Sequence, residues 1–383
     1  MHEVDAADIA ALEEAARRFA ETEVRPHLAA WEAAGEFPRA IYARLGELGW
    51  LGMGYPEALG GTPMPWRARI ALSVALARHT GSGGLLASGF SHAIGLPPIA
   101  LHGSDPLRSR IVPDVLAGRA ISALAVTEPG GGSDVAALRT RALRDGGDYV
   151  IDGEKTFITS GMRADWLTVA VRTEPAAKGA AGISLLAVPG DAPGLTRSRL
   201  EKMGWLCSDT AHLHFDGVRV PASHLIGEEG KGFRLVMANF NGERMNIAAI
   251  ALGMCECCYD EALDWARQRQ TFGQPLAAHQ VVRHKLADMQ MRIASTRAWL
   301  DRVAAHADAG DAGAEWVAEV CLLKNHATQA LQFCADQAVQ ILGGMGYMRG
   351  TASERIYREV KVLMIGGGAE EIMKDLAARQ LGI

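Results

Sequence analysis

The chain has 383 residues, of which 49% are apolar and 22% charged, with 39 Lys and Arg against 44 Asp and Glu. This composition excludes disorder and collagen, and the length predicts two or three domains or one large helical assembly. The net charge of −5, without long basic runs, disfavours nucleic acid as a partner.

The first residues carry Glu and Asp at helical spacing and no basic leader, so no secretory signal is predicted. The longest apolar stretches, around Leu72–Leu76 and Ile247–Met254, are shorter than the roughly 20 residues that span a bilayer. Six cysteines are too few for a disulfide framework. These features predict a cytoplasmic protein without a membrane span.

Residues 1–120 are predicted to form an N-terminal helical domain, because apolar residues recur every three or four positions between Gly and Pro. The clearest helices are expected at Ile9–Ala20, Pro38–Leu48 and Ala68–His79.

Residues 121–230 contain short runs that are alternating or rich in β-branched residues, which predicts a middle antiparallel β domain, a sandwich or barrel, with a hairpin around Gly146 and Gly147. Residues 231–383 return to a helical period over three or four helices of 20 residues or more. This last region is predicted to be a C-terminal helical bundle, which makes the fold class α+β and multidomain.

Several common sites are not predicted. The glycine groups at 130–132 and 343–346 do not fit G-x-G-x-x-G between a strand and a helix, and no P-loop motif occurs. The pairs His212-x-His214 and Cys255-x-Cys257 lack further ligands at zinc spacing, which favours ordinary histidines and small core cysteines over a metal site.

Glu243 is the most informative anomaly, because it falls on the apolar face of a predicted helix, three residues after Phe240 and four before Ile247. A buried carboxylate must pair, keep its proton or face a ligand pocket. The neighbouring Arg244 points about 100° away around the helix and is poorly placed to pair with it. An ion pair with another element and a catalytic base both remain open at this point.

The segment Val126–Asp134 leaves a predicted strand through three glycines and exposes backbone N–H groups and hydroxyls, either as a plain turn or as a site for an anion or heterocycle. In the following strand, Phe157 and Thr159 are two residues apart and share one face. One side chain can stack on a ring while the other donates a hydrogen bond.

The segments VTEPGGGSD, KTFITSG, RQTFGQPLAAHQ and QILGGMGYMRGTASERIYREVKVLMIGGGAEEIM, in this order, resemble the acyl-CoA dehydrogenase family of flavoproteins over nearly the whole chain. The resemblance implies an N-terminal helical domain, a middle β domain and a C-terminal four-helix bundle. It also implies one FAD per subunit, an acyl-CoA substrate, a homotetramer or dimer, and electron-transferring flavoprotein as the electron acceptor.

The resemblance also assigns expected roles to single residues. Thr127 and Thr159 are expected to hydrogen-bond the isoalloxazine ring and Phe157 to pack on it, while Ser133 is expected beside the FAD pyrophosphate or the acyl-CoA. The substrate is expected to contact Arg244 and Gly368. The remaining cofactor contacts, partly to the FAD of a neighbouring subunit, are expected from Arg269, Phe272, Gln280, Gln340, Gly344 and Glu371.

The family's commonest base is a Glu in a Y-E-G-T segment, and Gly367 stands at that position here. A minority of members, including isovaleryl-CoA and long-chain acyl-CoA dehydrogenases, instead carry the carboxylate in the helix of the E-R pair, which is Glu243-Arg244 in this chain. The resemblance therefore favours Glu243 as the base over its competitors Glu370 and Glu371.

The implied reaction is α,β-dehydrogenation of an acyl-CoA, in which Glu243 takes the α proton and the flavin takes a hydride. Flavin monooxygenases and oxidases of the same fold generally lack this carboxylate, and a non-catalytic acyl-CoA-binding homologue would not need intact flavin motifs. The small residues at Gly242 and Gly366–Gly368 favour branched or longer acyl chains.

Overall fold

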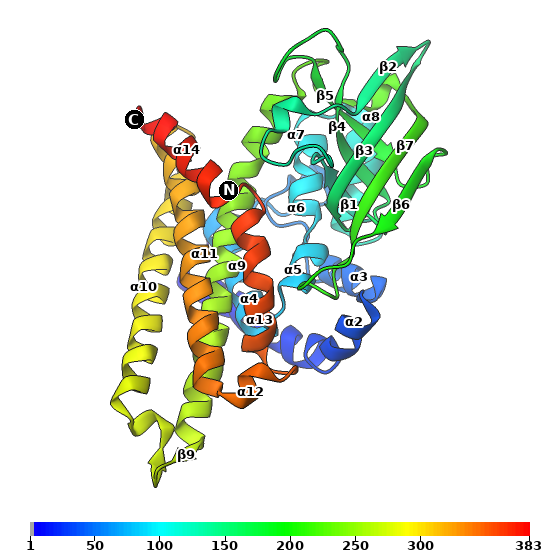
Figure 1. Cartoon of the computed structure of the whole chain (residues 1–383). Coiled ribbons are helices and arrows are strands. Elements are labelled where there is room, and N and C mark those ends of the chain that lie inside the picture. Colours follow the sequence, from blue (N-terminus) through cyan, green and yellow to red (C-terminus); the bar gives the residue numbers. More distant parts are fainter. Residues whose placement is uncertain (1–3) are drawn as a thin grey trace.

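The computed structural model describes residues 4–383 (Figure 1). Helices fill its N-terminal region. The first of them begins at a capping box in which the Asp5 carboxylate accepts the N–H groups of Ala7 and Asp8, and the fifth begins at Ser82, whose hydroxyl accepts the N–H of Leu85. The helices are α1 (Ala6–Phe19), α2 (Leu28–Ala34), α3 (Arg39–Glu47), α4 (Trp66–Thr80), α5 (Gly83–Gly89), α6 (His92–Gly95), α7 (Pro97–His102) and α8 (Asp105–Leu116).

A mixed sheet follows the helical region. Its order is β6-β7-β3-β2-β4-β5-β8, with β1 paired to β4. The predicted hairpin is present, since β2 and β3 pair antiparallel up to Asp145 and Asp148. The strands are β1 (Ser122–Ala125), β2 (Arg141–Asp145), β3 (Asp148–Thr159), β4 (Trp166–Arg172), β5 (Ile183–Pro189), β6 (Leu195–Arg199), β7 (Thr210–Pro221) and β8 (Leu225–Ile226).

The expectation of a wholly antiparallel domain is wrong for β1, which pairs parallel to β4 from Ser122 opposite Trp166 to Ala125 opposite Val169. A single further pair, Arg141 with Arg172, joins β2 to β4 in the same parallel sense. Side-chain alternation indicates which face of a strand is buried, but not the direction of its neighbour. The long connection between β1 and β4 allows either direction.

The two faces of this sheet bury different cores. On one face, side chains from β2, β3, β4, β5 and β7 pack on one another, with Tyr149, Leu167 and Phe215 at their centre. On the other face, Leu124, Leu185 and further strand residues pack against the helical segment that contains α7 and α8. The second core fixes the β region against the N-terminal helices, which holds the loop after β1 in place.

The C-terminal region is a bundle built on three long helices. In α9, consecutive turns are buried on nearly every side, and each large aliphatic side chain buried there contributes about 1.5–3 kcal/mol. A small hairpin (β9, Gln270–Thr271; β10, Gln274–Pro275) joins α9 to α10. The helices are α9 (Gly232–Gln268), α10 (Gln280–Asp308), α11 (Ala314–Leu342), α12 (Gly344–Tyr347), α13 (Ala352–Ile365) and α14 (Glu370–Leu381).

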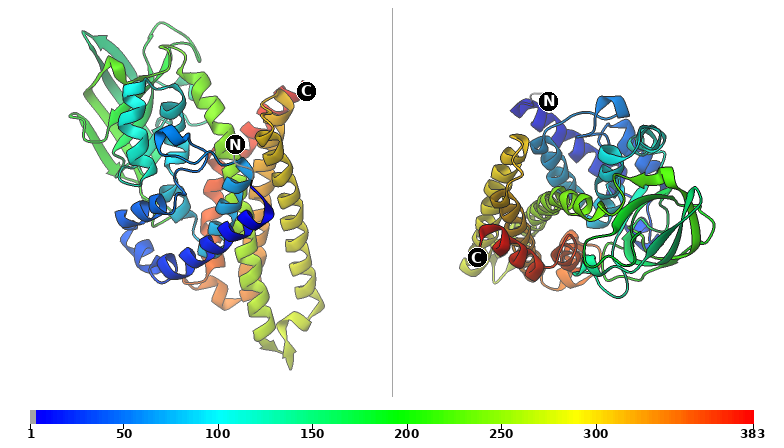
Figure 2. Two further views of the ribbon diagram at one scale, coloured as in Figure 1. Left: turned by 180° about the vertical axis from the view of Figure 1, so that it is seen from behind. Right: turned by 90° about the horizontal axis from the view of Figure 1, so that it is seen from above.

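The C-terminal end of the bundle consists of two shorter helices, α13 and α14, instead of one long helix. The helix α13 ends before three glycines, and two of these, Gly367 (φ 67°) and Gly368 (φ 115°), adopt backbone angles that other residues rarely take. The chain turns there and restarts as α14. Figure 2 shows from above that α9 runs through the middle of the molecule, between the N-terminal helices, the β region and α13. The break between α13 and α14 therefore faces the centre of the fold.

Candidate functional site

A cavity of about 1270 Å³ opens where the three regions meet. Such a volume exceeds the roughly 300–1,000 Å³ of a pocket for one small ligand, so it can hold a cofactor and a substrate together. It is lined by α4 and the α5–α7 segment, by the ends of β1 and β3, by α9, and by the glycine break between α13 and α14.

Glu243 lies in the wall of this cavity. Its Oε2 atom is inaccessible to solvent and has no hydrogen-bond partner within residues 4–383. Burial raises the pKa of this carboxyl to about 7, against the opposing positive charges of Arg244 and Lys324. An unpaired carboxylate with a pKa near neutrality, facing a cavity, can exchange a proton with a bound molecule.

Arg244 turns away from Glu243, as the helix geometry predicts. Its guanidinium donates to the Gly367 carbonyl oxygen at 3.0 Å and to Asn241 Oδ1 at 2.9 Å. Within residues 4–383 no ion pair links Glu243 to Arg244 or to a cation of another element, so the ion pair that the sequence left open is not found. Arg244 instead links α9 to the glycine break.

Lys324 of α11 is a site residue that the sequence reasoning missed. It is fully buried, and its ammonium donates to the carbonyl oxygens of Met364 (2.9 Å) and Gly368 (2.8 Å). Burial lowers its pKa to about 8. The available signal was a lone lysine inside the apolar run EVCLLKNHATQAL. Its position means that a cation supports the glycine break directly behind Glu243.

Gly367 lies beside the carboxyl group of Glu243. A Cβ atom at Gly367 would be 3.9 Å from Glu243 Cδ and 2.8 Å from Ile247 Cδ1. A side chain at either position would therefore reach the same part of the cavity.

Gly242 was expected to leave room for the acyl chain, but a Cβ there would be 2.8 Å from Trp66 Cη2. The space that Gly242 leaves is filled by the indole of Trp66 rather than opened to a ligand.

The two competing carboxylates do not share the setting of Glu243. Glu370 accepts hydrogen bonds from Lys374 (2.6 Å) and Gln329 (2.7 Å), and the Lys374 hydrogen bond lowers its pKa. Glu371 is exposed and does not line the cavity. Neither group is a buried, unpaired carboxyl.

Four of the candidates from the β region, namely Thr127, Ser133, Phe157 and Thr159, line the same cavity as Glu243. Phe157 has a positive φ of 60° and keeps 71% of its side chain exposed. Holding a bulky residue in this conformation costs on the order of 1–2 kcal/mol. The strain presents an aromatic ring toward the cavity, where a planar ligand can stack on it.

Trp205 also lines this part of the cavity, with a positive φ of 54° and a buried Nε1 that has no hydrogen-bond partner within residues 4–383. No sequence pattern marks this residue, since a lone tryptophan between predicted strands is usually a packing residue. The residue adds a second large aromatic group to the cavity lining, while its Nε1 lies against Gly83, where a Cβ would be 2.3 Å away.

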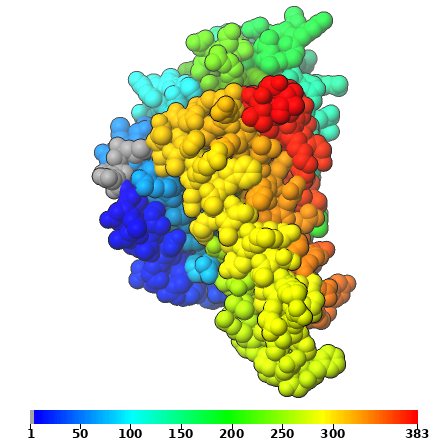
Figure 3. Space-filling model, turned by 90° about the vertical axis from the view of Figure 1, so that its left-hand side faces the viewer, coloured from blue at the N-terminus to red at the C-terminus, as the bar shows by residue number. Residues whose placement is uncertain are grey.

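The other cofactor candidates lie elsewhere in this chain. Phe272, 97% exposed, sits in the hairpin at the narrow tip where α9 meets α10 (Figures 1 and 3). The candidates outside the cavity lining are Arg269, Phe272, Gln280, Gln340, Gly344 and Glu371. A single chain therefore does not bring them to Glu243.

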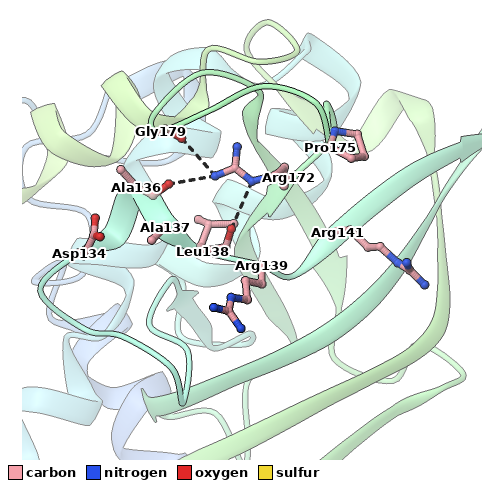
Figure 4. Close-up of a pocket in the computed structure, with 9 residues that line it drawn as sticks. All are labelled: Asp134, Ala136, Ala137, Leu138, Arg139, Arg141, Arg172, Pro175 and Gly179. Atoms are coloured by element: carbon pink, nitrogen blue, oxygen red, sulfur yellow. Dashed lines mark hydrogen bonds between the residues drawn. The ribbon is translucent and has the colours of Figure 1, made fainter.

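A smaller hollow of about 420 Å³ lies in the β region, next to the residues that come after the glycine-containing segment Val126–Asp134 (Figure 4). Its central guanidinium, Arg172, is taken up by backbone carbonyls, including those of Leu138, Ala136 and Gly179. Arg172 thus ties the segment after Ser133 to the loop before β5. Through Arg172 this hollow supports the segment that follows Ser133.

Residues 4–383 hold no group of three His, Cys, Asp or Glu side chains that could bind a metal ion. His212 and His214 both lie beside Glu154, at 3.8 and 3.5 Å, a carboxylate that the sequence reasoning did not connect with them.

Within residues 4–383, no single helix is long and apolar enough to cross a membrane. The helical segments Gly83–Gly89 and His92–His102 together have the length and composition of a span, but they are bent by 44° relative to each other.

Residues 7–119, 123–218 and 230–382 match the N-terminal, middle and C-terminal domains of acyl-CoA dehydrogenases. The chain is 37% identical to cyclohexane-1-carbonyl-CoA dehydrogenase of Geobacter metallireducens, over 96% of both proteins. It is also 37% identical to the long-chain specific acyl-CoA dehydrogenase of Mus musculus, over 96% of this chain and 85% of that protein. A solved structure of a probable acyl-CoA dehydrogenase from Mycobacterium abscessus is 46% identical and superposes with a TM-score of 0.95 over 99% of each chain.

The fold, the cavity and these likenesses define an enzyme, an oxidoreductase of the flavoprotein class. The chain belongs to the acyl-CoA dehydrogenase family, and its reaction is the FAD-dependent α,β-dehydrogenation of an acyl-CoA thioester to the 2-enoyl-CoA. The resemblance seen in the sequence is confirmed, and a monooxygenase or a non-catalytic homologue is not favoured.

Proposed function

We propose that Glu243 is the base that removes the α proton of the acyl-CoA. The observation that carries this proposal is its buried, unpaired Oε2 atom in the cavity wall. Burial raises the pKa of the carboxyl to about 7, which makes the ionised form a better proton acceptor while a large fraction stays ionised near neutral pH. The base therefore needs no neighbouring residue to activate it.

The thioester oxygen needs a donor where enolate charge develops. The Gly368 N–H donates to no described group, whereas its carbonyl oxygen is held by Lys324 at 2.8 Å. Lys324 thereby fixes the next peptide unit, between Gly368 and Ala369, and so holds the turn on the far side of the donor. Arg244 orients the donor itself, because the Gly367 carbonyl that it holds at 3.0 Å belongs to the same peptide unit as the Gly368 N–H. Ser133, which also lines the cavity, is proposed to contact the substrate or the cofactor.

We propose that the chain binds FAD in the part of the cavity lined by Thr127, Phe157 and Thr159. The strained, exposed ring of Phe157 fits a planar ligand, and the hydroxyls of Thr127 and Thr159 can hydrogen-bond its polar atoms. A glutaryl-CoA dehydrogenase of Mycobacterium smegmatis, 26% identical, is described in complex with FADH2. When bound, the flavin supplies the acceptor for the hydride that leaves the β carbon.

The candidates at the far end of the bundle support an oligomer. Phe272 is 97% exposed and Tyr347 is 84% exposed. Exposed aromatic side chains of this size are typical of surfaces that bind another molecule. We propose that Arg269, Phe272, Gln280, Gln340 and Gly344 meet a cofactor bound by another copy in a homotetramer or dimer. Glu371 stays a candidate cofactor contact on the strength of the resemblance alone.

Three broader proposals complete this assignment. The electron acceptor is proposed to be electron-transferring flavoprotein, since one similar solved chain, 28% identical, comes from a structure described for that protein in Acidaminococcus fermentans. The compartment is proposed to be the cytoplasm, from the sequence features alone. The regions 1–120, 121–230 and 231–383 are proposed to be the domains of the chain.

The rate of flavin reduction is expected to rise with pH through a midpoint near 7. The sign follows from the pKa of Glu243, which burial raises from 4.5 to about 7. Below that value the carboxyl is protonated and cannot accept the α proton, whereas above it the carboxylate is free to do so. Stopped-flow reduction by saturating acyl-CoA between about pH 5.5 and 9 measures the midpoint. A rate that is flat across this range would argue against Glu243 as the base.

Anaerobic addition of acyl-CoAs to the purified holoenzyme is expected to bleach its flavin. Trp66 fills the space beside Gly242, so the room for the acyl group comes from the glycine break rather than from Gly242. A panel of straight and branched acyl-CoAs, each matched with its free acid, provides substrate and control. If no acyl-CoA reduced the flavin, the dehydrogenase assignment would fail.

A further inference from the structure

Arg69 of α4 lies in the wall of the cavity in an unusual setting. Its guanidinium carbon is 3.8 Å from the centre of the Trp66 ring, which covers one face. Gly54 covers the guanidinium as well, since a Cβ there would be 2.8 Å from Nη1 and 2.9 Å from Cζ. The group is held by its flat faces, which leaves its N–H edge as the binding surface.

The Arg69 guanidinium makes no hydrogen bond or ion pair with any residue of the described chain. Burial lowers its pKa, and only distant attraction from Tyr55 and Asp308 opposes this. Both of these groups are engaged elsewhere. Asp308 accepts the backbone N–H groups of Trp66 (2.5 Å) and Arg67 (3.3 Å), and the Tyr55 hydroxyl donates to the His92 carbonyl oxygen at 3.4 Å.

The other cations of this cavity do not share this property. Each remaining Lys or Arg in the lining, within residues 4–383, has a hydrogen bond to a carbonyl, carboxylate, hydroxyl or sulfur acceptor; these are Lys202, Arg244, Arg358, Lys361 and Arg379. Desolvating a charge without pairing it is costly. Arg69 is thus prepared for an anion that the protein itself does not supply.

Trp66 connects Arg69 with the place where the α carbon of the substrate is proposed to lie, beside Glu243. Trp66 contacts Gly242, the neighbour of Glu243, with its ring edge and Arg69 with its ring face. Glu243, Trp66 and Arg69 line one cavity, so an acyl group with its α carbon at Glu243 is taken to run along Trp66 toward Arg69. The apolar residues Ile70 and Phe90 line it as well and suit the intervening methylene groups.

We propose that the preferred substrate is an acyl-CoA whose acyl chain ends in a carboxylate, and that Arg69 binds this distal carboxylate through its N–H edge. A planar fork of donors matches the two oxygens of a carboxylate. This inference rests on the proposed function of the site, because it takes the α carbon to lie at Glu243. It makes Arg69 a specificity-determining residue rather than a catalytic one.

The test compares carboxylate-ended and plain acyl-CoAs of equal carbon number, adipyl-CoA against hexanoyl-CoA and suberyl-CoA against octanoyl-CoA. The holoenzyme is expected to show higher kcat/KM for the carboxylate-ended member of at least one pair. In Arg69→Met the ratio of the two kcat/KM values is expected to fall by about 30-fold or more, as for loss of one partner of a buried charge pair. Arg69→Lys, which keeps the charge but not the planar fork, is expected to lie between.

Arg67→Met is the matched control, since Arg67 lies on the same helix but is exposed and outside the cavity lining. It is expected to keep the wild-type ratio. A wild-type enzyme that reduces only with plain acyl-CoAs, or an Arg69→Met enzyme with an unchanged ratio, would overturn the inference while leaving the dehydrogenase assignment intact. Absence of reduction by every acyl-CoA would instead remove the proposed function. If Arg69→Met failed to fold, the ratio in Arg69→Lys would decide.

Discussion

Glu243→Gln is expected to lower the rate of flavin reduction by acyl-CoA by about 10²–10⁴-fold, the range over which a general base contributes. The amide has nearly the same size as the carboxyl but cannot take the α proton. Its neighbours stay as they are, because the Oε2 atom that it replaces has no partner within residues 4–383. Rapid-mixing reduction under anaerobic conditions, at saturating substrate, measures this loss directly.

Stability provides the control for this variant. Because burial raises the pKa of Glu243 from 4.5 to about 7, the folded protein keeps a proton that the unfolded chain releases between these values. The free energy of unfolding therefore falls as pH rises across this window, and above pH 7 the ionised carboxylate destabilises the folded state. Glu243→Gln is expected to have a Tm at about pH 8 no lower than that of the wild type. A slow variant that is also less stable at that pH would point to misfolding instead.

Moving the carboxylate to the neighbouring segment is expected to restore part of the activity. In Glu243→Gly the base is absent, and adding Gly367→Glu places a carboxyl in the same region, because the Cβ of residue 367 would be 3.9 Å from the present Glu243 Cδ. The double variant is expected to reduce its flavin at least about tenfold faster than Glu243→Gly alone, a fraction of the contribution of a well-placed base. Stopped-flow reduction of the two variants with the same acyl-CoA gives the comparison.

The relocated side chain has a cost that bounds the gain. Gly367 has a φ of 67°, and a new Cβ would meet Ile247 Cδ1 at 2.8 Å, so Glu at this position is strained by on the order of 1–3 kcal/mol. Gly366→Glu in the Glu243→Gly background is the matched control, since a Cβ at 366 meets only the Val362 carbonyl oxygen. If both relocations restored activity equally, the proximity of Gly367 to Glu243 would not be the cause.

Much of the fold was readable because local patterns and tertiary structure agree. The helical period before residue 120 and after 231 reflects helices that bury one face, and the β hairpin at Gly146 carries its own turn signal. Glu243 was found for the opposite reason, since a carboxylate on an apolar helix face breaks the pattern. Local rules fail most visibly at functional sites.

The missed features depend on contacts between distant segments. The parallel pairing of β1 with β4 joins residues about 40 positions apart, and alternation within a strand carries no information on its partner. Lys324 matters because its ammonium reaches Gly368, and Arg69 matters because no acceptor of the described chain hydrogen-bonds its guanidinium. Neither property can be read from the residues beside them in sequence. The packing of Trp66 beside Gly242 could not be read from the sequence for the same reason.

The most direct measurement of the central claim is deuterium exchange at the α carbon of an acyl-CoA analogue whose β position is a sulfur atom, so that no β hydride can leave. Holoenzyme in D₂O is expected to incorporate deuterium at the α carbon at a rate that rises with pH through about 7, following the pKa of Glu243. Glu243→Gln, with its flavin bound, is expected to lose this exchange. Equal incorporation by the two enzymes would show that another group removes the proton and would contradict the account.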